Sequence, residues 1–188
     1  MRSRSTTRDA LSAEPMLGIT VKGMEMETLP GGRALVVIVD DRQAHGEKTD
    51  NIGPLVRELL TEAGYHVDAT VAVAADEVEI RNALNTAVIG GVDLVVSIGG
   101  TGSSARDVTP EATAAVLDRE IPGLAEALRA SGRTDSVHDA ALSRGLAGVS
   151  GSTVVVNLAS SRAAVRDGMA TIGPLVAHVI TEQSTFEE

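Results

Sequence analysis

Runs of apolar residues alternate with helix-like patterns along the first half of the chain. Continuous, β-branched runs at 34–40, 66–74 and 93–100 are typical of buried parallel strands. Between them, the segments 51–64 and 76–91 have helical spacing and end at glycines. A strand–helix–strand–helix–strand order predicts parallel strands joined by crossover helices, and therefore an α/β fold.

The second half has a less regular pattern. It predicts helices over 110–120 and 121–133, with Asp118-Arg119-Glu120 ending the first of them in solvent. A hairpin is expected within 140–160, and its second strand, 153–158, is expected inside the sheet. A long helix over 161–184 completes the expected elements.

Residues 1–32 differ in composition from the rest of the chain. They mix Ser, Thr, Arg, Met and Glu and close with Leu29-Pro30-Gly31-Gly32. Two interpretations stay open: a flexible tail, which is common at termini, or an N-terminal arm that docks on a neighbouring subunit. The remaining residues, 33–188, are expected to form one domain.

Composition narrows the function classes. The formal net charge of −10 makes nucleic acid a poor partner, and with one Tyr, one Phe and no Trp there is no base-stacking platform. The absence of cysteine excludes disulfides and thiolate metal sites, which fits a cytoplasmic protein. We expect no membrane span, because no run of 18 apolar residues occurs, and no signal peptide, because the N-terminus lacks an apolar core.

Part of the stretch SIGGTGSSARDVTPEA, residues 97–112, has a purely structural explanation. Thr109 fits a helix N-cap, Pro110 fits the first helical position, and Glu111 complements the helix dipole. These three residues therefore need no further function.

The glycine-rich turn before them carries more information. Gly99, Gly100, Thr101 and Gly102 follow a predicted central strand, at the end of the sheet where open α/β folds bind ligands. Glycines there allow backbone N–H groups to approach an anion closely. The turn matches neither a Walker A loop nor G-x-G-x-x-G, and a tight turn without a ligand remains the alternative.

Asp107 lies two positions before the expected cap, so capping does not explain it. A carboxylate beside a phosphate-binding turn would repel the phosphate unless a cation lay between them. Mg²⁺, which proteins usually hold with one or two carboxylates plus phosphate oxygens, would serve. Arg106 offers a direct phosphate contact. The alternative for the two residues is an Arg–Asp surface pair.

The stretch GGTGSSARDVTPEA resembles the signature of the MoaB/Mog family of molybdenum-cofactor biosynthesis proteins, and the resemblance continues at REIPGLAEALR and ALSRGLAGVSGSTVVVNLASSRAAVRDGM. It covers about residues 33–182. It implies a three-layer α/β/α domain with a mostly parallel central sheet, commonly a homotrimer or a dimer of trimers. Well-understood members bind molybdopterin and Mg-ATP, transfer AMP to the terminal phosphate of molybdopterin and release pyrophosphate.

Matched residue by residue, the resemblance implies catalytic and Mg²⁺-holding roles for Asp76 and Asp107. It implies ligand-binding roles for Gly99, Gly100, Thr101, Gly102, Asp41, Asp50, Ser143, Asn157 and Ser161. Without the resemblance, Asp76 is equally well explained as an acidic residue at a helix N-terminus.

The chain departs from the family pattern at three places. Asp40 replaces a Ser, and Asn51-Ile52 replaces Ser-Gly. The family's Pro-Gly-Ser-Pro-Lys-Ala is ASSRAA here, residues 159–164, so the lysine becomes Ala163. Arg162 is interpreted as restoring the positive charge one position earlier.

These changes keep alternatives to adenylyl transfer open. One is a catalytically weakened paralogue that acts as an oligomeric binding or regulatory protein, with a possible protein partner. Another is a generic α/β anion-binding domain with a different small phosphorylated substrate.

Overall fold

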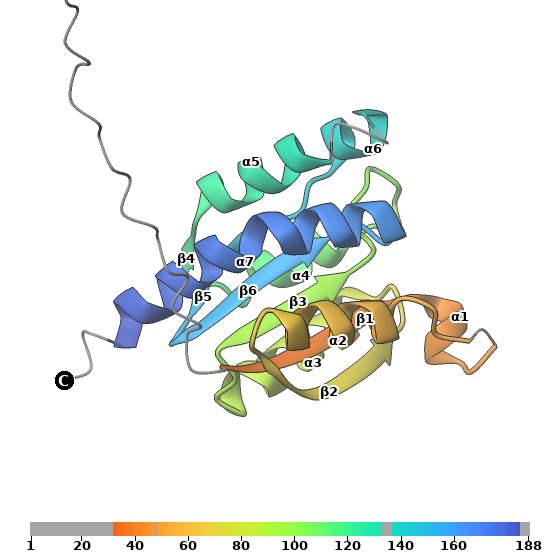
Figure 1. The fold of residues 1–188 in the computed structure, drawn as a ribbon. Coiled ribbons are helices and arrows are strands. Elements are labelled where there is room, and N and C mark those ends of the chain that lie inside the picture. The colour runs from red at the N-terminus through yellow and green to blue at the C-terminus, as the bar shows by residue number, and fades with distance from the viewer. Residues whose placement is uncertain (1–31, 48, 133–136, 185–188) are drawn as a thin grey trace, which may run out of the picture.

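The computed structural model describes residues 32–47, 49–132 and 137–184, which build a six-stranded sheet between two layers of helices (Figure 1). In sheet order the strands are β2 (His66–Val73), β1 (Arg33–Val39), β3 (Leu94–Ile98), β6 (Thr153–Leu158), β5 (Ala147–Ser150) and β4 (Arg119–Glu120). The first four are parallel and the last two pair antiparallel. The predicted three-layer, mostly parallel fold is confirmed.

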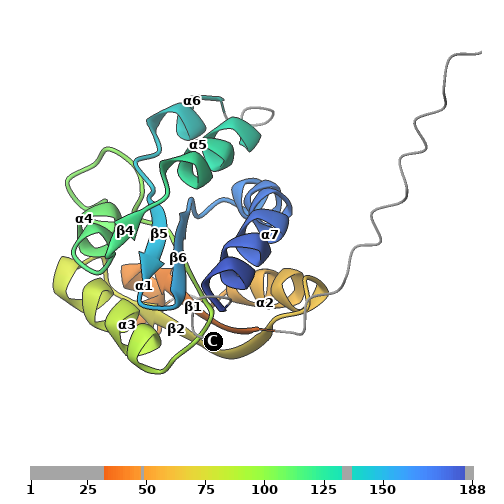
Figure 2. The ribbon, with the colours of Figure 1, turned by 90° about the vertical axis from the view of Figure 1, so that its left-hand side faces the viewer.

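Apolar residues point to both faces of the central strands, which explains their continuous hydrophobic runs. One face, with Val36 and Val96, packs against α2 (Gly53–Glu62), α5 (Pro122–Ser131) and α7 (Arg162–Ser184). The opposite face, with Val37 and Val95, packs against α3 (Glu77–Ile89) and α4 (Thr109–Ala114). Figure 2 shows these two helical layers on either side of the strands.

Two short helices lie in segments where the sequence predicted none: α1 (Asp41–Ala44) and α6 (Val137–Leu142). The first begins because the Asp40 carboxylate accepts hydrogen bonds from the N–H groups of Arg42 and Gln43, at 2.9 and 3.2 Å. Serine and aspartate are both good N-caps. The Asp40 departure from the family pattern therefore keeps a capping residue at this position.

The predicted helix over 110–120 is wrong in its second half. The helix α4 ends at Ala114, and Arg119 and Glu120 form the edge strand β4 opposite Val149 and Gly148. Main-chain groups of β5 compete for this segment: the Asp118 N–H donates to the Val149 carbonyl at 2.9 Å. Sheet pairing therefore overrides the helical pattern at Asp118-Arg119-Glu120.

The N-cap prediction for Thr109 is also wrong. Val108 precedes α4 and makes no side-chain capping bond, and the Thr109 hydroxyl donates instead to the Gly99 carbonyl at 2.8 Å. Because α4 begins at Thr109, Pro110 is its second residue and not the first, contrary to the prediction, whereas Glu111 lies in the first turn as predicted.

The N-terminal arm or tail was predicted over residues 1–32, of which 1–31 lie outside the described residues. The assignment of 33–188 to one domain stays a prediction. Among the described helices, none is both long and apolar enough to cross a membrane.

Candidate functional site

A cavity of about 380 Å³ opens where β3 and β6 end. The glycine-rich turn and Asp107 form one wall. The opposite walls come from α5, the segment before β5, the loop after β6 and the first turns of α7. This volume and this place, at the carboxyl ends of parallel strands, are those of small-molecule sites in open α/β sheets.

The turn itself requires glycine at two positions. Gly99 and Gly100 have φ angles of +101° and +62°. A Cβ atom would lie 2.6 Å from the Val39 carbonyl oxygen at Gly99, and 2.4 Å from the Thr109 hydroxyl at Gly100. Left-handed backbone and close packing therefore both exclude a side chain.

The four carbonyl groups of the turn are all occupied by donors from elsewhere in the fold. Thr109 donates to two of them: its hydroxyl to Gly99, and its N–H to Gly100 at 3.1 Å. Arg144 donates to the other two, through its N–H to Thr101 at 2.8 Å and its Nε to Gly102 at 2.7 Å. Among the described residues, the N–H groups of Gly100, Thr101 and Gly102 have no acceptor. The turn thus presents donors but few acceptors.

Arg144 holds more than the turn. Its guanidinium also donates to the carbonyl of Asp107 and forms an ion pair with Glu111. The Arg144 hydrogen bond lowers the pKa of the Glu111 carboxyl, and the same bond raises the pKa of Arg144. A single side chain therefore fixes the turn, Asp107 and α4 relative to one another.

Asp107 closes the loop that follows the turn. Its Oδ2 accepts a hydrogen bond from the Ser104 N–H at 2.8 Å, and a Cβ added at Gly102 would lie 2.8 Å from the same oxygen. The carboxylate therefore lies against the glycine turn in the cavity wall, beside its unpaired donors.

Asp41 and Arg106 join the end of β1 to this loop. The Oδ1 of Asp41 accepts from the Ala75 N–H at 2.8 Å, and Oδ2 pairs with Arg106. The Ala75 hydrogen bond is the main cause that lowers the pKa of Asp41, with Arg106 contributing and burial opposing. The partner of Arg106 in the structure is Asp41, so Arg106 and Asp107 do not form the surface pair considered from the sequence.

Two other predicted site residues accept hydrogen bonds from main-chain N–H groups near the start of a helix: Asp76 is the N-cap of α3, and Asp50 lies two residues before Ile52, the N-cap of α2. The Oδ1 of Asp76 accepts from the N–H groups of Val78 and Glu79 at 2.9 and 3.0 Å, at the start of α3. The Oδ1 of Asp50 accepts from the N–H groups of Ile52 and Gly53 at 2.9 and 2.7 Å, before α2. Asp41, Asp50 and Asp76 do not line the cavity; Asp50 lines a second depression beside Arg57 and Thr70.

Ser143, Asn157 and Ser161 do line the cavity. Ser161 caps α7, because its Oγ accepts from the Ala164 N–H at 3.1 Å. The Ser143 Oγ lies 3.4 Å from the Gly145 N–H.

The buried amide of Asn157 is engaged on both sides. Its Nδ2 donates to the hydroxyls of Ser97 and Thr113 at 2.7 and 2.9 Å, and its Oδ1 accepts from the Leu146 N–H at 2.9 Å. These bonds connect β3, β6, α4 and the segment before β5. The side-chain amide of Asn157 therefore makes its hydrogen bonds within the fold.

The altered loop after β6 forms the far wall of the cavity. Ser160 and Ala163 line it, whereas Arg162 does not. The Arg162 guanidinium donates to the Asn51 carbonyl at 2.9 Å. The structure therefore directs this charge toward Asn51 and does not place it in the cavity wall, contrary to the interpretation from the sequence. Two of the chain's departures from the family pattern contact each other.

Three charged side chains line the cavity among the described residues: Asp107, Arg129 on α5 and Asp167 on α7. Arg129 and Asp167 were not predicted from the sequence as site residues. A signal was present in the helix spacing, because Arg129 follows the buried Ala125 by one turn, and Asp167 lies one turn after the small Ala163.

No group of three or more His, Cys, Asp or Glu side chains within 32–47, 49–132 and 137–184 is arranged to hold a metal ion. Mg²⁺ does not need such a group when phosphates supply the remaining ligands. Asp107, a carboxylate beside donors suited to phosphate, fits that arrangement.

Comparisons with known proteins identify the family of this chain. Residues 35–178 match the family model described as "Probable molybdopterin binding domain". A solved molybdopterin biosynthesis protein from Mycobacterium abscessus is 62% identical, with a TM-score of 0.80 over 84% of this chain and 99% of that one. The molybdopterin adenylyltransferase of Pyrococcus furiosus is 35% identical over 77% of this chain and 87% of its own length.

Some relatives are longer proteins. The chain is 37% identical to a molybdenum cofactor biosynthesis bifunctional protein from Synechococcus elongatus, over 80% of this chain and 47% of that protein. It therefore spans about half the length of the first curated relatives that it matches. From the family model and these relatives together, the chain belongs to the MoaB/Mog family of molybdenum-cofactor biosynthesis proteins, which carry a molybdopterin-binding domain.

Proposed function

We propose that the chain binds molybdopterin and Mg-ATP at the cavity and transfers AMP to the terminal phosphate of molybdopterin, with release of pyrophosphate. The observation that carries this proposal is the glycine turn, whose carbonyls are occupied and whose N–H groups are not. A relative of matching length named molybdopterin adenylyltransferase supports it. A homotrimer or dimer of trimers, in the cytoplasm, is part of the proposal.

The turn would bind phosphate through its backbone. The N–H groups of Gly100, Thr101 and Gly102 supply donors without side-chain charge, as anion-binding nests do. Arg144 acts through the turn, because it holds two of its carbonyls and the Asp107 carbonyl. We therefore assign Arg144 a positioning role.

Asp107 would hold Mg²⁺ together with phosphate oxygens. When bound there, Mg²⁺ would supply positive charge between the carboxylate and the phosphates. The Oδ2 of Asp107 is fixed by Ser104. Asp76, whose described contacts are those of a helix cap, keeps its metal-binding role only as a prediction from the resemblance.

In the proposed transfer, no side chain of the protein forms a covalent bond to the substrates. An oxygen of the terminal phosphate of molybdopterin attacks the α-phosphorus of ATP, and the bond from that phosphorus to the β-phosphate bridging oxygen breaks. A phosphate monoester is largely ionised at neutral pH, so no base is needed to activate it. The residues of the turn and Asp107 therefore act by orientation and by stabilising charge.

The test is calorimetric titration with Mg-ATP and with molybdopterin separately, followed by assay of the mixture for adenylated pterin and pyrophosphate. Asp107→Asn should abolish transfer and leave the fold intact. Glu62→Gln, an exposed carboxylate at the end of α2, is the matched control and should keep full activity. Full transfer by Asp107→Asn would refute the role of Asp107.

A second candidate is the weakened paralogue that binds without efficient transfer. The favouring observation is Ala163 in the cavity wall, at the family's lysine position. If the lost lysine limits the reaction, Ala163→Lys should raise the rate of adenylated pterin formation. Binding of both ligands with no product from either protein would favour the binding or regulatory role, and co-purification would then be used to seek a protein partner.

A further inference from the structure

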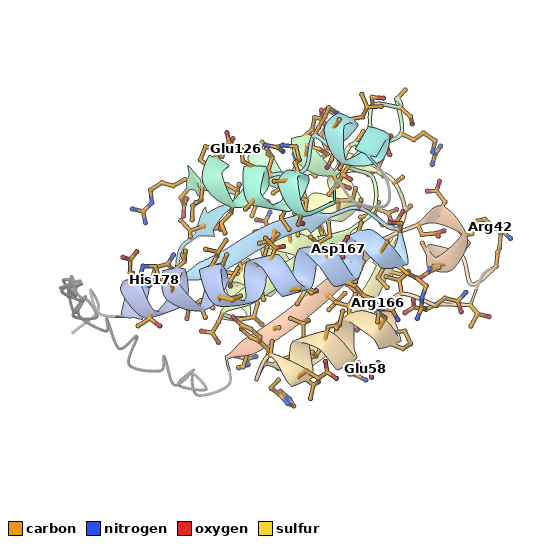
Figure 3. The ribbon with its side chains drawn as sticks, turned by 45° about the horizontal axis from the view of Figure 1, so that its top comes forward. Arg42, Glu58, Glu126, Arg166, Asp167 and His178 are labelled. Carbon is orange, nitrogen blue, oxygen red and sulfur yellow. The ribbon has the colours of Figure 1, made fainter. Side chains whose placement is uncertain are left out.

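The end of the cavity between α5 and α7 lies opposite the glycine turn and holds two opposite charges. Asp167 comes from α7 and Arg129 from α5. Figure 3 shows Asp167 on the side of α7 toward α5, whereas the neighbouring Arg166 lies toward α2. Neither Asp167 nor Arg129 has a role in the ligand binding considered so far.

Most of the wall around these charges is apolar. Leu128, Leu142 and Leu158 line it, and α7 contributes small residues, Ala164 and Gly168. Small residues on one wall and aliphatic side chains on the others leave room for a flat ring. Cavities that bind cofactors commonly combine such walls with a few polar groups that fix orientation.

The polar groups restrict what that ring can be. Among the described residues, the Asp167 carboxylate has no hydrogen-bond or ion-pair partner, whereas its main-chain carbonyl accepts from the Thr171 hydroxyl. A carboxylate only accepts hydrogen bonds. Its complement is therefore a pair of adjacent N–H donors. Arg129 only donates; one of its five N–H groups binds the Gly145 carbonyl at 3.1 Å, which anchors the guanidinium at the cavity wall.

We propose that Asp167 and Arg129 form a ring-recognition site for the 2-amino-4-oxopyrimidine edge of a pterin. The amino N–H and the ring N3–H of the pterin donate to the Asp167 carboxylate, and its 4-oxo oxygen accepts from Arg129. This inference rests on the proposed function for the identity of the pterin substrate.

The same hydrogen-bonding groups would bind adenine, the ring of ATP, poorly. Adenine presents a ring nitrogen acceptor beside its amino group, so a carboxylate opposite that edge would face a lone pair. Unpaired polar groups in a closed site are costly, which makes donor–acceptor mismatch an effective source of specificity. Asp167 therefore assigns the pterin to the α5/α7 end, and adenine to another part of the site.

The test uses two fluorescent ring compounds without phosphate, pterin and lumazine, with no nucleotide present. Lumazine has a 2-oxo group where pterin has the 2-amino group. Wild type should bind pterin at least about tenfold more tightly than lumazine, because a charge-assisted bond is lost. Asp167→Asn should reverse the preference, because its amide N–H can donate to the 2-oxo group while its oxygen still accepts from N3–H.

Glu126→Gln, an exposed carboxylate on α5 outside the cavity, is the matched control and should keep the wild-type ratio. Asp167→Ala serves as a second variant and should abolish the preference without reversing it. An unchanged pterin-to-lumazine ratio in both Asp167 variants would overturn the proposal. So would binding of neither ring to wild type, or, in a separate experiment with AMP added, displacement of pterin by AMP at concentrations similar to those at which pterin itself binds.

These outcomes are separable from those of the proposed function. Adenylated pterin formed with an unchanged ratio in the Asp167 variants would refute the ring site and leave the transfer reaction standing. The predicted reversal without any adenylated product would support the ring site and refute the transfer.

Discussion

Replacing Asn157 by alanine distinguishes a structural from a ligand-binding role for this residue. The resemblance implies a contact to ligand, yet the side-chain amide makes three hydrogen bonds inside the fold. Asn157 is 4% exposed. If these bonds are its function, the substitution should chiefly lower the free energy of unfolding.

The magnitude follows from the partners that are left behind. The Leu146 N–H is held by the local backbone and loses its acceptor, at a cost of about 1–3 kcal/mol. The hydroxyls of Ser97 and Thr113 can rotate, so each lost bond there costs about 0.5–1 kcal/mol. A loss of about 3 kcal/mol is expected, which moves the urea midpoint down by about 1.5 M for a slope near 2 kcal/mol/M.

Urea denaturation of wild type and Asn157→Ala, followed by circular dichroism, measures this loss. Ser161→Ala is the comparison: it also removes a polar side chain from the cavity wall, but it loses a helix cap worth only about 1 kcal/mol. An Asn157→Ala protein with the wild-type urea midpoint and no ligand binding would refute the structural assignment.

Four further predictions follow from other contacts. Gly99→Ala should destabilise the protein by more than about 2 kcal/mol, because residue 99 has a positive φ and the added Cβ would clash with the Val39 carbonyl. Gly123→Ala, in α5 with open space around it, should instead stabilise the protein by about 0.5 kcal/mol. Thermal melts of the two variants measure both effects. Tyr65, the chain's one tyrosine, has its pKa raised to about 12 by burial and by Asp93, so absorbance titration should show no ionisation near pH 10. Its contribution to stability is therefore present below pH 10 and lost as pH rises toward 12, and ionisation at pH 10 in the folded protein would contradict this. Arg106→Ala should raise the pKa of Asp41 only part of the way to its ordinary value, because the hydrogen bond from the Ala75 N–H, the main cause of the lowered pKa, remains. An Asp41 pKa at its ordinary value in the variant, measured by NMR titration of the carboxyl group, would contradict this. Arg162→Ala should leave phosphate affinity, measured by calorimetry, within about twofold, because its guanidinium binds Asn51 outside the cavity wall, and a tenfold loss would show that its charge acts on the ligand.

The parts of the fold predictable from sequence are those fixed by local pattern. Strands such as 93–100 were visible because burial on both faces leaves a continuous apolar run, and the helix over 76–91 because its acidic start and glycine end mark its limits. The strand at Arg119-Glu120 was not predictable, because its two residues are exposed and gain their structure only from pairing with β5.

In the candidate site, too, some residues could be predicted from the local sequence and others could not. Glycine at 99 and 100 and the carboxylate of Asp107 belong to one short stretch, so their proximity could be expected from sequence. Arg129 and Asp167 reach the cavity from helices that meet only in the folded chain. Their residue types did not predict a place in the cavity, because an Arg or an Asp on an amphipathic helix usually faces solvent.

The residues that hold the glycine turn differ from those that depart from the family pattern. The donors to the turn's carbonyls come from Thr109 and Arg144, both inside stretches that carry the resemblance. The altered residues act elsewhere: Arg162 binds Asn51, and Ala163 lines the far wall. Phosphate binding at the turn should therefore depend on Arg144 and be insensitive to the 159–164 loop. We therefore expect the altered residues that line the cavity, Ser160 and Ala163, to affect catalysis through the far wall and to leave the glycine turn intact.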